Sequence, residues 1–549
     1  MTLPAGIKPL IIEKWNWTNA HSNFTQKLRE NCSFELTVSD EEFESKYKTF
    51  KEKYNATTEN IQWLIKYAID KNIRLKPMGS GWSLTKVNVS EDGIINTKKL
   101  RLKAQLGQSQ IAQSYIDKGG DPSNLLFAQC GNTIISINDL LEKERNPPKS
   151  LKASGGSNGQ TIVGALSTGT HGAAFKFGAL SEFVVGMHIV VGPDRHVWLE
   201  RASYEVTSKE FRSWIKAEVI LDDDLFNSAL ISFGSFGFIH SLLIEVEPKY
   251  LLEQELKVVP YDDGLLKAIT EADFTGLASK LKYPLDVANK SLYHFEVAIN
   301  PHKFKKNDPE EGAYIRVMYK QPYRSDYTRF EPETKGHTYG DDVLGYIQQV
   351  LDAVEKIPGK LELALIPKAV NALFKTAFDR PEAAIGTVGE TFRNTVFRGQ
   401  LFSGAYTFDR KDIPRVVDIA LDINKQIPFA GVIALRFIKG TKATLGPAQF
   451  PNTCVLEMDG VDAEVNHNFI EELTYRIESE NIRYGIHWGK INKVLNKERV
   501  RRMYGNEKVD KWLKHRKQLL QSVDVRNVFN NGFLEQCGLD KWDESIGPV

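Results

Sequence analysis

The sequence contains little cysteine and no segment that is long and apolar. Its 549 residues include four widely spaced cysteines that form no CxxC pair: Cys32, Cys130, Cys454 and Cys537. This spacing argues against a disulfide framework and against a cysteine metal cage, so we expect free buried thiols and no bound metal. Unpaired thiols also favour a cytoplasmic location.

An excess of charge of one sign is also missing. Lys plus Arg is 71 and Asp plus Glu is 70, so no global field draws the chain to nucleic acid or to an anionic membrane. No apolar run approaches the ~20 residues needed to span a bilayer. The N-terminal apolar patch follows no basic segment, so no signal peptide is predicted. A GxGxxG motif that opens a helix is absent, which disfavours a nicotinamide site.

The length predicts two large domains or one split domain. Residues 58–70 place apolar side chains at helical spacing, and Ile73–Pro77 then predicts a short strand. Phe183–Val191 and Val197–Glu200 predict paired strands around a Gly-Pro-Asp turn. Phe226–Pro248 predicts a helix that leads through glycines into a strand.

The pattern changes near residue 250, where an antiparallel sheet with covering helices is predicted. The expected strands are Leu292–Asn300, Tyr314–Tyr319, Leu401–Phe408, Val432–Ile438 and Thr453–Met458. The expected helices are Val343–Lys356 and Ile413–Gln426. The predicted fold class is therefore α+β with two domains.

Three clusters of small residues interrupt these elements. They are Gly79-Ser80-Gly81-Trp82-Ser83, Gly164 to Ala174 around His171, and Gly234-Ser235-Phe236-Gly237. Small side chains let the backbone approach a flat or anionic ligand closely, with N–H groups free to donate. Each cluster alone is also typical of an ordinary tight turn.

These clusters, followed by His487-Trp488-Gly489-Lys490, resemble the vanillyl-alcohol-oxidase-type (PCMH-type) FAD-binding flavoproteins. Within them, the HWGK signature is most similar to the aldonolactone and alditol oxidases. The segment 303–390 is longer than the compact sugar oxidases need, and it resembles the enlarged cap of type II cholesterol oxidase. The resemblance implies an FAD domain from residues 1–250 and 479–549 and a substrate-binding cap domain from residues 251–478.

The resemblance also implies the residues that hold FAD. The expected cofactor-binding residues are Gly79, Ser80, Gly81, Trp82, Ser83, Gly164, Ser167, Thr168, Gly169, Thr170, His171, Gly172, Gly234, Gly237 and Ile239. Many members carry a flavin-linked histidine where Trp82 stands, so FAD is expected to be non-covalent here, unless His171 supplies the link. His171 can alternatively be a buried histidine bonded to the backbone.

The expected catalytic residues are Lys490, His487, Arg436 and Glu457. In this family the lysine points into the site, whereas the alternative for this segment is edge packing with a solvated lysine. The family has Glu two residues before the arginine, but this chain has Ala434. An arginine in a semi-buried site needs an acid. Glu457 is our hypothesis for that acid and Glu296 is the alternative, although either could be a solvent-facing strand residue.

The implied activity is oxidation of an alcohol group of a sugar, polyol or aldonolactone (EC 1.1), with hydride transfer to flavin N5 and electrons passed to O2 or another acceptor. One alternative is oxidation of a bulky apolar alcohol such as a sterol. A pocket for it could be lined by the apolar residues between Leu361 and Phe374, which are also typical of a helix core. A second alternative is a flavin-binding protein without alcohol oxidase activity.

Overall fold

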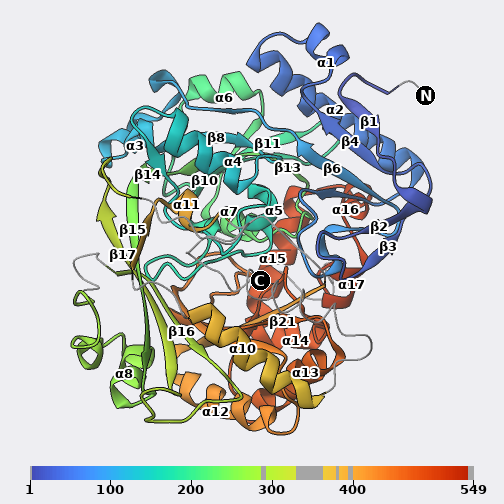
Figure 1. The fold of residues 1–549 in the computed structure, drawn as a ribbon. Coiled ribbons are helices and arrows are strands. Elements are labelled where there is room, and N and C mark those ends of the chain that lie inside the picture. The colour runs from blue at the N-terminus through green and yellow to red at the C-terminus, as the bar shows by residue number, and fades with distance from the viewer. Residues whose placement is uncertain (1–2, 286–291, 329–362, 379–382, 394–399, 542–549) are drawn as a thin grey trace.

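Three β-sheets organise the protein in this computed structural model, which describes residues 3–285, 292–328, 363–378, 383–393 and 400–541. Two of the sheets come from the first 250 residues and the third from the rest of the chain (Figure 1). Helices pack against each of them. The predicted α+β class is confirmed.

The first sheet has four strands and is mostly parallel. In spatial order they are β1 (Ile7–Pro9), β4 (Phe34–Thr37), β6 (Gly93–Lys99) and β5 (Leu75–Met78). Helices α1 (Glu41–Lys46) and α2 (Phe50–Lys71) connect β4 to β5. A capping box of Thr49 and Glu52 begins α2, which contains the predicted helix, and β5 is the predicted strand after it.

The second sheet has six strands. In spatial order they are β12 (Glu218–Leu221), β11 (His196–Glu200), β10 (Val184–Val190), β13 (Phe238–Glu245), β8 (Leu125–Gln129) and β7 (Lys103–Ala104). The predicted pairing is confirmed, because β10 and β11 are antiparallel neighbours. Its helices are α3 (Gln113–Asp117), α4 (Ile134–Asp139), α5 (Ile162–Ser167), α6 (Lys209–Ile215) and α7 (Asp223–Leu230).

The third sheet has eight antiparallel strands. In spatial order they are β18 (Ala383–Gly386), β15 (Tyr250–Val259), β17 (Ala313–Pro322), β16 (Leu292–Ile299), β20 (Gly431–Lys439), β21 (Asn452–Val461), β19 (Leu401–Asp409) and β22 (Gly485–Ile486). All five strands predicted after residue 250 are therefore confirmed.

Helices cover this third sheet. They are α8 (Asp263–Glu271), α10 (Ile366–Phe378), α11 (Val388–Thr391), α12 (Ile413–Asn424) and α13 (Glu464–Ser479). The apolar stripe predicted for residues 413–426 is buried along α12. The helix predicted at Val343–Lys356 lies outside the described residues.

After β22 the chain returns to the N-terminal sheets through α14 (Lys497–Tyr504), α15 (Asn506–Leu519), α16 (Val523–Val528) and α17 (Gly532–Cys537). In Figure 1 α14 lies beside α13, α15 lies near the centre of the molecule, and α16 lies beside the N-terminal strands. Trp512 packs on Phe236 with 4.9 Å between the ring centroids, and Arg516 Nε donates to the Ser235 carbonyl at 3.0 Å. The last helices thus brace the third small-residue cluster.

The structure also bears on the cysteines and on membrane-spanning segments. All four cysteines are buried and unpaired, which confirms the expectation of free thiols. Among the residues that the structure describes, no helix has the length and apolar character that crossing a membrane requires.

Candidate active site

A single deep cavity brings the separated motifs together. The loops of the N-terminal half form one side, and β19, β20 and β21 of the large sheet contribute the other. The cavity volume, including the part open to solvent, is about 1420 Å3. The cavity therefore joins the small-residue loops to the charged face of the large sheet.

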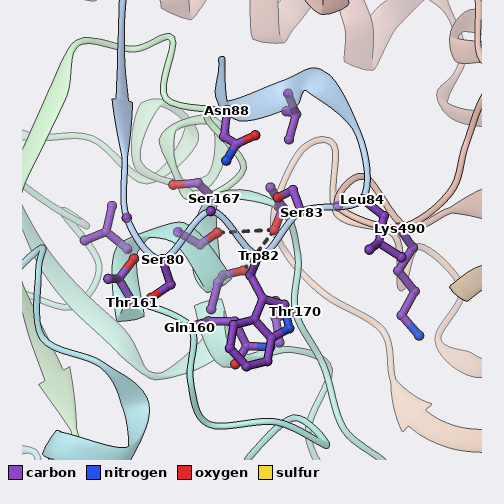
Figure 2. A pocket seen from close by; sticks show the side chains of 18 of the residues that line it. Ser80, Trp82, Ser83, Leu84, Asn88, Gln160, Thr161, Ser167, Thr170 and Lys490 are labelled. Atoms are coloured by element: carbon purple, nitrogen blue, oxygen red, sulfur yellow. Dashed lines mark hydrogen bonds between the residues drawn. The ribbon is translucent and has the colours of Figure 1, made fainter. Parts of the chain in front are cut away.

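The first cluster, Gly79–Ser83, follows β5 and packs directly on the start of α5. A Cβ atom at Gly79 would lie 1.9 Å from Thr161 Oγ1, so only glycine fits there. Ser80 Oγ donates to the Gly159 carbonyl at 2.7 Å. Figure 2 shows Ser80 and Trp82 beside Thr161 and Gln160 along the cavity. The local contacts therefore hold two backbone loops at close range.

The second cluster forms α5 and the turn that follows it. Gly164, Ser167, Thr168, Thr170 and His171 line the cavity, as predicted from their position in the sequence. Gly169 and Gly172 are not among the lining residues. Gly169 has φ +80 and faces Pro447, and a Cβ at Gly172 would lie 2.1 Å from the Ser154 carbonyl. These two glycines shape the turn from behind the cavity wall.

His171 is buried and neutral. Its Nδ1 donates to the Gly172 carbonyl at 3.0 Å, so the backbone-bonded alternative is seen, and its ring also faces the cavity. Burial lowers the pKa of His171 below 6.5. Its Nε2 has no hydrogen-bond partner among the described residues and lies 3.7 Å from Glu457 Oε1. His171 can therefore accept a hydrogen bond from a ligand.

The third cluster reaches the cavity through Gly234, Gly237 and Ile239. Gly234 and Gly237 have φ of +61 and +106, a region that favours glycine. Lys76, which sequence reasoning missed, is fully buried and donates to the carbonyls of Phe233 at 2.7 Å and Gly234 at 3.1 Å. Burial holds the pKa of Lys76 well below its usual range. The sequence signal that could have identified Lys76 is a lysine inside a strand that is otherwise buried.

Trp82, for which the resemblance predicts the position of a flavin-linked histidine in other members, lines the cavity. Its ring meets His21 edge-on, with 5.4 Å between centroids. His21 also lines the cavity, and burial lowers its pKa to about 3. Sequence reasoning missed His21, because it lies outside the three small-residue clusters.

The other side of the cavity is one face of the large sheet, and we call it the cap side after the predicted cap domain. Glu296 lies directly opposite Arg436 on β20 and opposite Arg316 on β17. Arg436 Nε donates to Glu296 Oε2 at 2.9 Å, and Arg316 Nη1 donates to Oε1 at 3.1 Å. Burial acts to raise the pKa of Glu296, but the two guanidinium groups lower it below its usual range. Arg436 is thus held by Glu296.

Glu457 lies in the next row of the same face, directly opposite Ala434. Residues opposite each other on antiparallel strands are about 5 Å apart, so Glu457 brings a carboxylate beside the position where the family has one. Lys490 Nζ donates to Glu457 Oε2, and Arg436 Nη1 lies 3.7 Å from Oε1. Burial acts to raise the pKa of Glu457, yet Lys490 and Arg436 lower it to about 2.

Both glutamates are 1% exposed, so the solvent-facing alternative is wrong for each. The physical reason is that other segments cover this face of the sheet: His171 from the N-terminal half and Lys490 from the loop after β22 lie against Glu457. Edge packing with a fully solvated lysine is also wrong, because the Lys490 side chain is 21% exposed and pairs with Glu457.

His487 and Trp488 fix the loop that carries Lys490. The His487 Nδ1 accepts from the Gly489 N–H at 3.0 Å, and burial lowers the pKa of His487 well below 6.5. Trp488 is buried and its Nε1 donates to the Leu445 carbonyl at 2.8 Å. The Leu84 N–H donates to the Gly489 carbonyl at 2.8 Å, which joins this loop to the first cluster.

Sequence reasoning also missed Arg316, Ser403 and Asp459. Ser403 and Asp459 line the cavity, and Arg316 completes the row that holds Glu296. Each sits in a strand that alternates between apolar and other residues, and only the strand register shows which face it occupies.

Comparison with known proteins supports the family resemblance. No family model matches the chain. The D-arabinono-1,4-lactone oxidase of Candida glabrata is 22% identical over 212 residues, which is 39% of this chain and 35% of that protein. The L-gulonolactone oxidase 3 of Arabidopsis thaliana is 23% identical over 479 residues, which is 80% of this chain and 74% of that protein. The match thus spans about a third of the length of the Candida relative.

A crystal structure of cholesterol oxidase from Brevibacterium sterolicum aligns over 97% of this chain and 98% of that one, with a TM-score of 0.66 and 14% sequence identity. The predicted resemblance is confirmed. The chain is a homologue of aldonolactone oxidases and has the fold of cholesterol oxidase.

Proposed function

We propose that this protein is an FAD-dependent oxidoreductase that oxidises an alcohol group of a sugar, polyol or aldonolactone and passes the electrons to O2 or another acceptor. The observation that carries the proposal is the cavity itself, which is lined by three small-residue loops and by two cations, the buried Arg436 and the partly exposed Lys490. Its homologues are oxidases of aldonolactones, which supports the substrate class.

The residues present fit FAD. A Cβ atom at Gly79 would collide with Thr161, and one at Gly237 would lie 2.6 Å from the Val190 carbonyl. These glycines therefore let the cavity-lining loops pack closely, and loops of this kind can present backbone N–H groups to a diphosphate. The Thr161 side chain, at the start of α5, makes no cap hydrogen bond there. The Nε2 of His171 and the Oε1 of Glu457 are buried polar atoms without a hydrogen-bond partner among the described residues. A ligand that fills the cavity would satisfy both.

When bound, FAD supplies the redox chemistry by accepting a hydride. The residues of this chain would supply orientation and charge. Lys490 and Arg436 would stabilise negative charge that develops on the substrate oxygen. Glu296 would hold Arg436 in place, and the neutral His171 and His487 would add no opposing charge. With Trp82 at the usual linkage position, we propose that FAD is held without a covalent bond.

A sterol-like alcohol is the second candidate. Ala434 belongs to an apolar cluster with Ile366, Val370, Leu373 and Phe374 of α10, which lies beside the charged row. Within the described residues this cluster is packed core and does not line the cavity. It supports a sterol substrate only because it makes the surroundings of Ala434 less polar. Leu361, the first residue of the predicted apolar pocket lining, lies outside the described residues.

The test starts from the colour of the purified protein. We expect FAD to bind, and acid precipitation to release it into the supernatant. Anaerobic addition of L-gulono-1,4-lactone, xylitol or cholesterol should then identify the class of alcohol that bleaches the flavin. A colourless protein contradicts the cofactor, and a yellow protein that no alcohol bleaches is a flavin binder without this activity.

Variants of Lys490 and of a nearby lysine then test whether the charge of Lys490 stabilises the developing oxyanion. We expect Lys490→Met to slow bleaching by about 10²–10³-fold, the usual effect of removing one group that stabilises a developing oxyanion. The matched control is Lys493→Met, which changes an exposed lysine three residues away and should leave bleaching unchanged. Equal rates in the two variants would exclude the role of Lys490.

A further inference from the structure

Two carboxylates project from β21 into the same cavity. Glu457 and Asp459 are two residues apart, so they share one face of the strand, and both line the cavity. Both are nearly inaccessible, at 1% and 4% exposed. A pair of acids this close in one buried site is costly unless their environments differ.

Their environments do differ. Glu457 is paired with Lys490, and it also lies 3.7 Å from Arg436 Nη1. Asp459 lies 3.8 Å from Lys490 Nζ and accepts a hydrogen bond from the hydroxyl of Ser403, which is directly opposite on β19. Both of these contacts involve Oδ1 of Asp459. Glu457 therefore accepts a hydrogen bond from one cation and has a second cation 3.7 Å away, whereas Asp459 has one cation at 3.8 Å and accepts its hydrogen bond from a neutral hydroxyl.

The titration behaviour follows from these contacts. Burial raises the pKa of Asp459 to about 6, and the charge of Glu457 acts in the same direction, against Lys490, Arg436 and Ser403. The pKa of Glu457 is lowered to about 2 by Lys490 and Arg436, despite its burial. Asp459 is thus the stronger base of the two. Environments that separate two carboxylates in this way typically assign different roles to them.

We propose that Asp459 is the base that accepts the hydroxyl proton of the substrate, and that Glu457 positions Lys490. This inference rests on the proposed function and adds a catalytic residue to it. It also replaces our sequence-based hypothesis that Glu457 takes over the work of the missing acid.

The proposed oxidation breaks two bonds of the substrate. The C–H bond breaks and its hydrogen leaves with the electron pair to the flavin, while the O–H proton passes to the Asp459 carboxylate. The electrons of the broken O–H bond form the new C=O bond. The product is a carbonyl compound, the flavin is reduced by two electrons, and neutral Asp459 later releases its proton to water in the open cavity. Glu457, as a much weaker base, stays ionised beside Lys490 throughout.

Ser403 is a positioning residue for this base. Its hydroxyl donates to Asp459 Oδ1, and hydrogen bonding to the charged form favours that form. The charged groups that face Asp459 are Lys490 from the loop after β22, Arg436 from β20 and Glu457 on its own strand. Removing Ser403 should therefore raise the pKa of Asp459, and removing the charge of Glu457 should lower it.

The experiment measures the rate of flavin reduction against pH in the holoenzyme, with the alcohol that bleaches the wild type fastest among L-gulono-1,4-lactone, xylitol and cholesterol. For the wild type we expect the rate to rise with pH and to level off above about pH 6 to 7. Asp459→Asn should lower the rate by about 10²–10⁴-fold and remove this rise. Asp462→Asn, just beyond the same strand, is the matched control, because its carboxylate pairs with His467 and Asn23.

Two further variants give shifts of opposite sign. Ser403→Ala should move the rise to higher pH, and Glu457→Gln should move it to lower pH. The carboxyl stretching band in infrared difference spectra provides a second readout. A band that titrates near pH 6 should be present in the wild type and in Asp462→Asn and absent in Asp459→Asn. If Glu457→Gln fails to fold, Ser403→Ala and the infrared titration still decide whether Asp459 is the base.

The inference is overturned if Asp459→Asn retains the wild-type rate or the wild-type pH rise, or if Ser403→Ala leaves the rise in place. Each of these results leaves the proposed function intact, because the wild type still oxidises the alcohol. A wild type that binds FAD but oxidises no alcohol overturns both.

Discussion

The two sides of the cavity are built from opposite kinds of side chain. The N-terminal side is rich in glycine, serine and threonine, and it adds Trp82, several apolar residues and two histidines, His21 and His171, whose pKa values burial lowers. The cap side carries Arg436, Glu457 and Asp459, with Lys490 reaching across to them. One side is shaped for close approach of backbone to a ligand, and the other concentrates charge.

From this difference we expect the two sides to respond differently to substitution. A small-residue loop fails when a side chain is added, because there is no space for it. A buried charge row fails when one side chain is removed, because the charge left behind has lost its partner. The comparison predicts the largest losses on the cap side.

Glu296→Ala should produce the largest effect. It leaves Arg316 and Arg436 buried without the carboxylate that lies between them, and breaking such a pair typically reduces stability by about 3–5 kcal/mol. Urea unfolding followed by circular dichroism measures the loss. The matched control is Glu218→Gln, which breaks an exposed pair with Arg195 and should change stability by less than about 1 kcal/mol. Similar losses in both variants would contradict the buried charge row.

Asp459→Asn and Glu457→Gln should change stability in opposite directions. The pKa of Asp459 rises from 3.8 to about 6 on folding, so the folded state binds the extra proton and stability falls as pH increases through this window. Asp459→Asn should therefore be more stable than the wild type at pH 8, by up to about 3 kcal/mol, with the gain shrinking toward pH 4.

For Glu457 the sign is reversed. Its pKa falls from 4.5 to about 2 on folding, so its contribution is fully present above pH 4.5 and is lost as pH decreases toward 2. Glu457→Gln should be less stable than the wild type at pH 8. Thermal unfolding of both variants at pH 5 and pH 8 checks the two signs, and a loss of stability for Asp459→Asn at pH 8 would refute the raised pKa.

On the N-terminal side, Gly79→Val should weaken FAD binding by up to about 100-fold. The added side chain would collide with Thr161 Oγ1, and overpacking of this kind typically costs about 1–3 kcal/mol. The ratio of flavin absorbance to protein absorbance after gel filtration measures the effect. Gly107→Ala is the control, since its Cβ would meet only Gln110 Oε1 at 3.6 Å. Full flavin content in Gly79→Val would show that this loop does not approach the cofactor.

Trp82→Phe should have the smallest effect, because it keeps an aromatic ring beside His21 and removes no covalent link. We expect less than a tenfold change in FAD affinity, corresponding to less than about 1.4 kcal/mol. Fluorescence titration of the apoprotein with FAD measures it. In both proteins acid should release all of the flavin, and colour that stays in the pellet would contradict non-covalent binding.

Much of this architecture could be predicted from sequence periodicity. The strands of the large sheet showed as short runs of apolar residues, and α2 and α12 showed as apolar stripes at helical spacing. The loops at Gly79–Ser83 and Gly234–Gly237 could be located because small residues are concentrated there. Such signals are local, since each depends on residues that are neighbours along the chain.

The charged side of the cavity could be predicted only in part. Arg436 and Lys490 were found through their motifs, and the carboxylate that accompanies them was narrowed to Glu457 or Glu296. The structure brings both into contact with Arg436, from two different neighbouring strands. Asp459 gave no signal, because an acid near the end of a strand is most often solvent-exposed.

The amino-acid sequence by itself determined the class of fold, the order of the strands along the chain and the places where backbone must come close to a ligand, because these follow from side-chain size and periodicity. Only the tertiary structure decided which acids meet which cations. The register of β16, β20 and β21 sets Glu296 against Arg436 and Glu457 against Ala434. The covering N-terminal half then buries that row, and burial is what drives the pKa values of Glu457 and Asp459 apart.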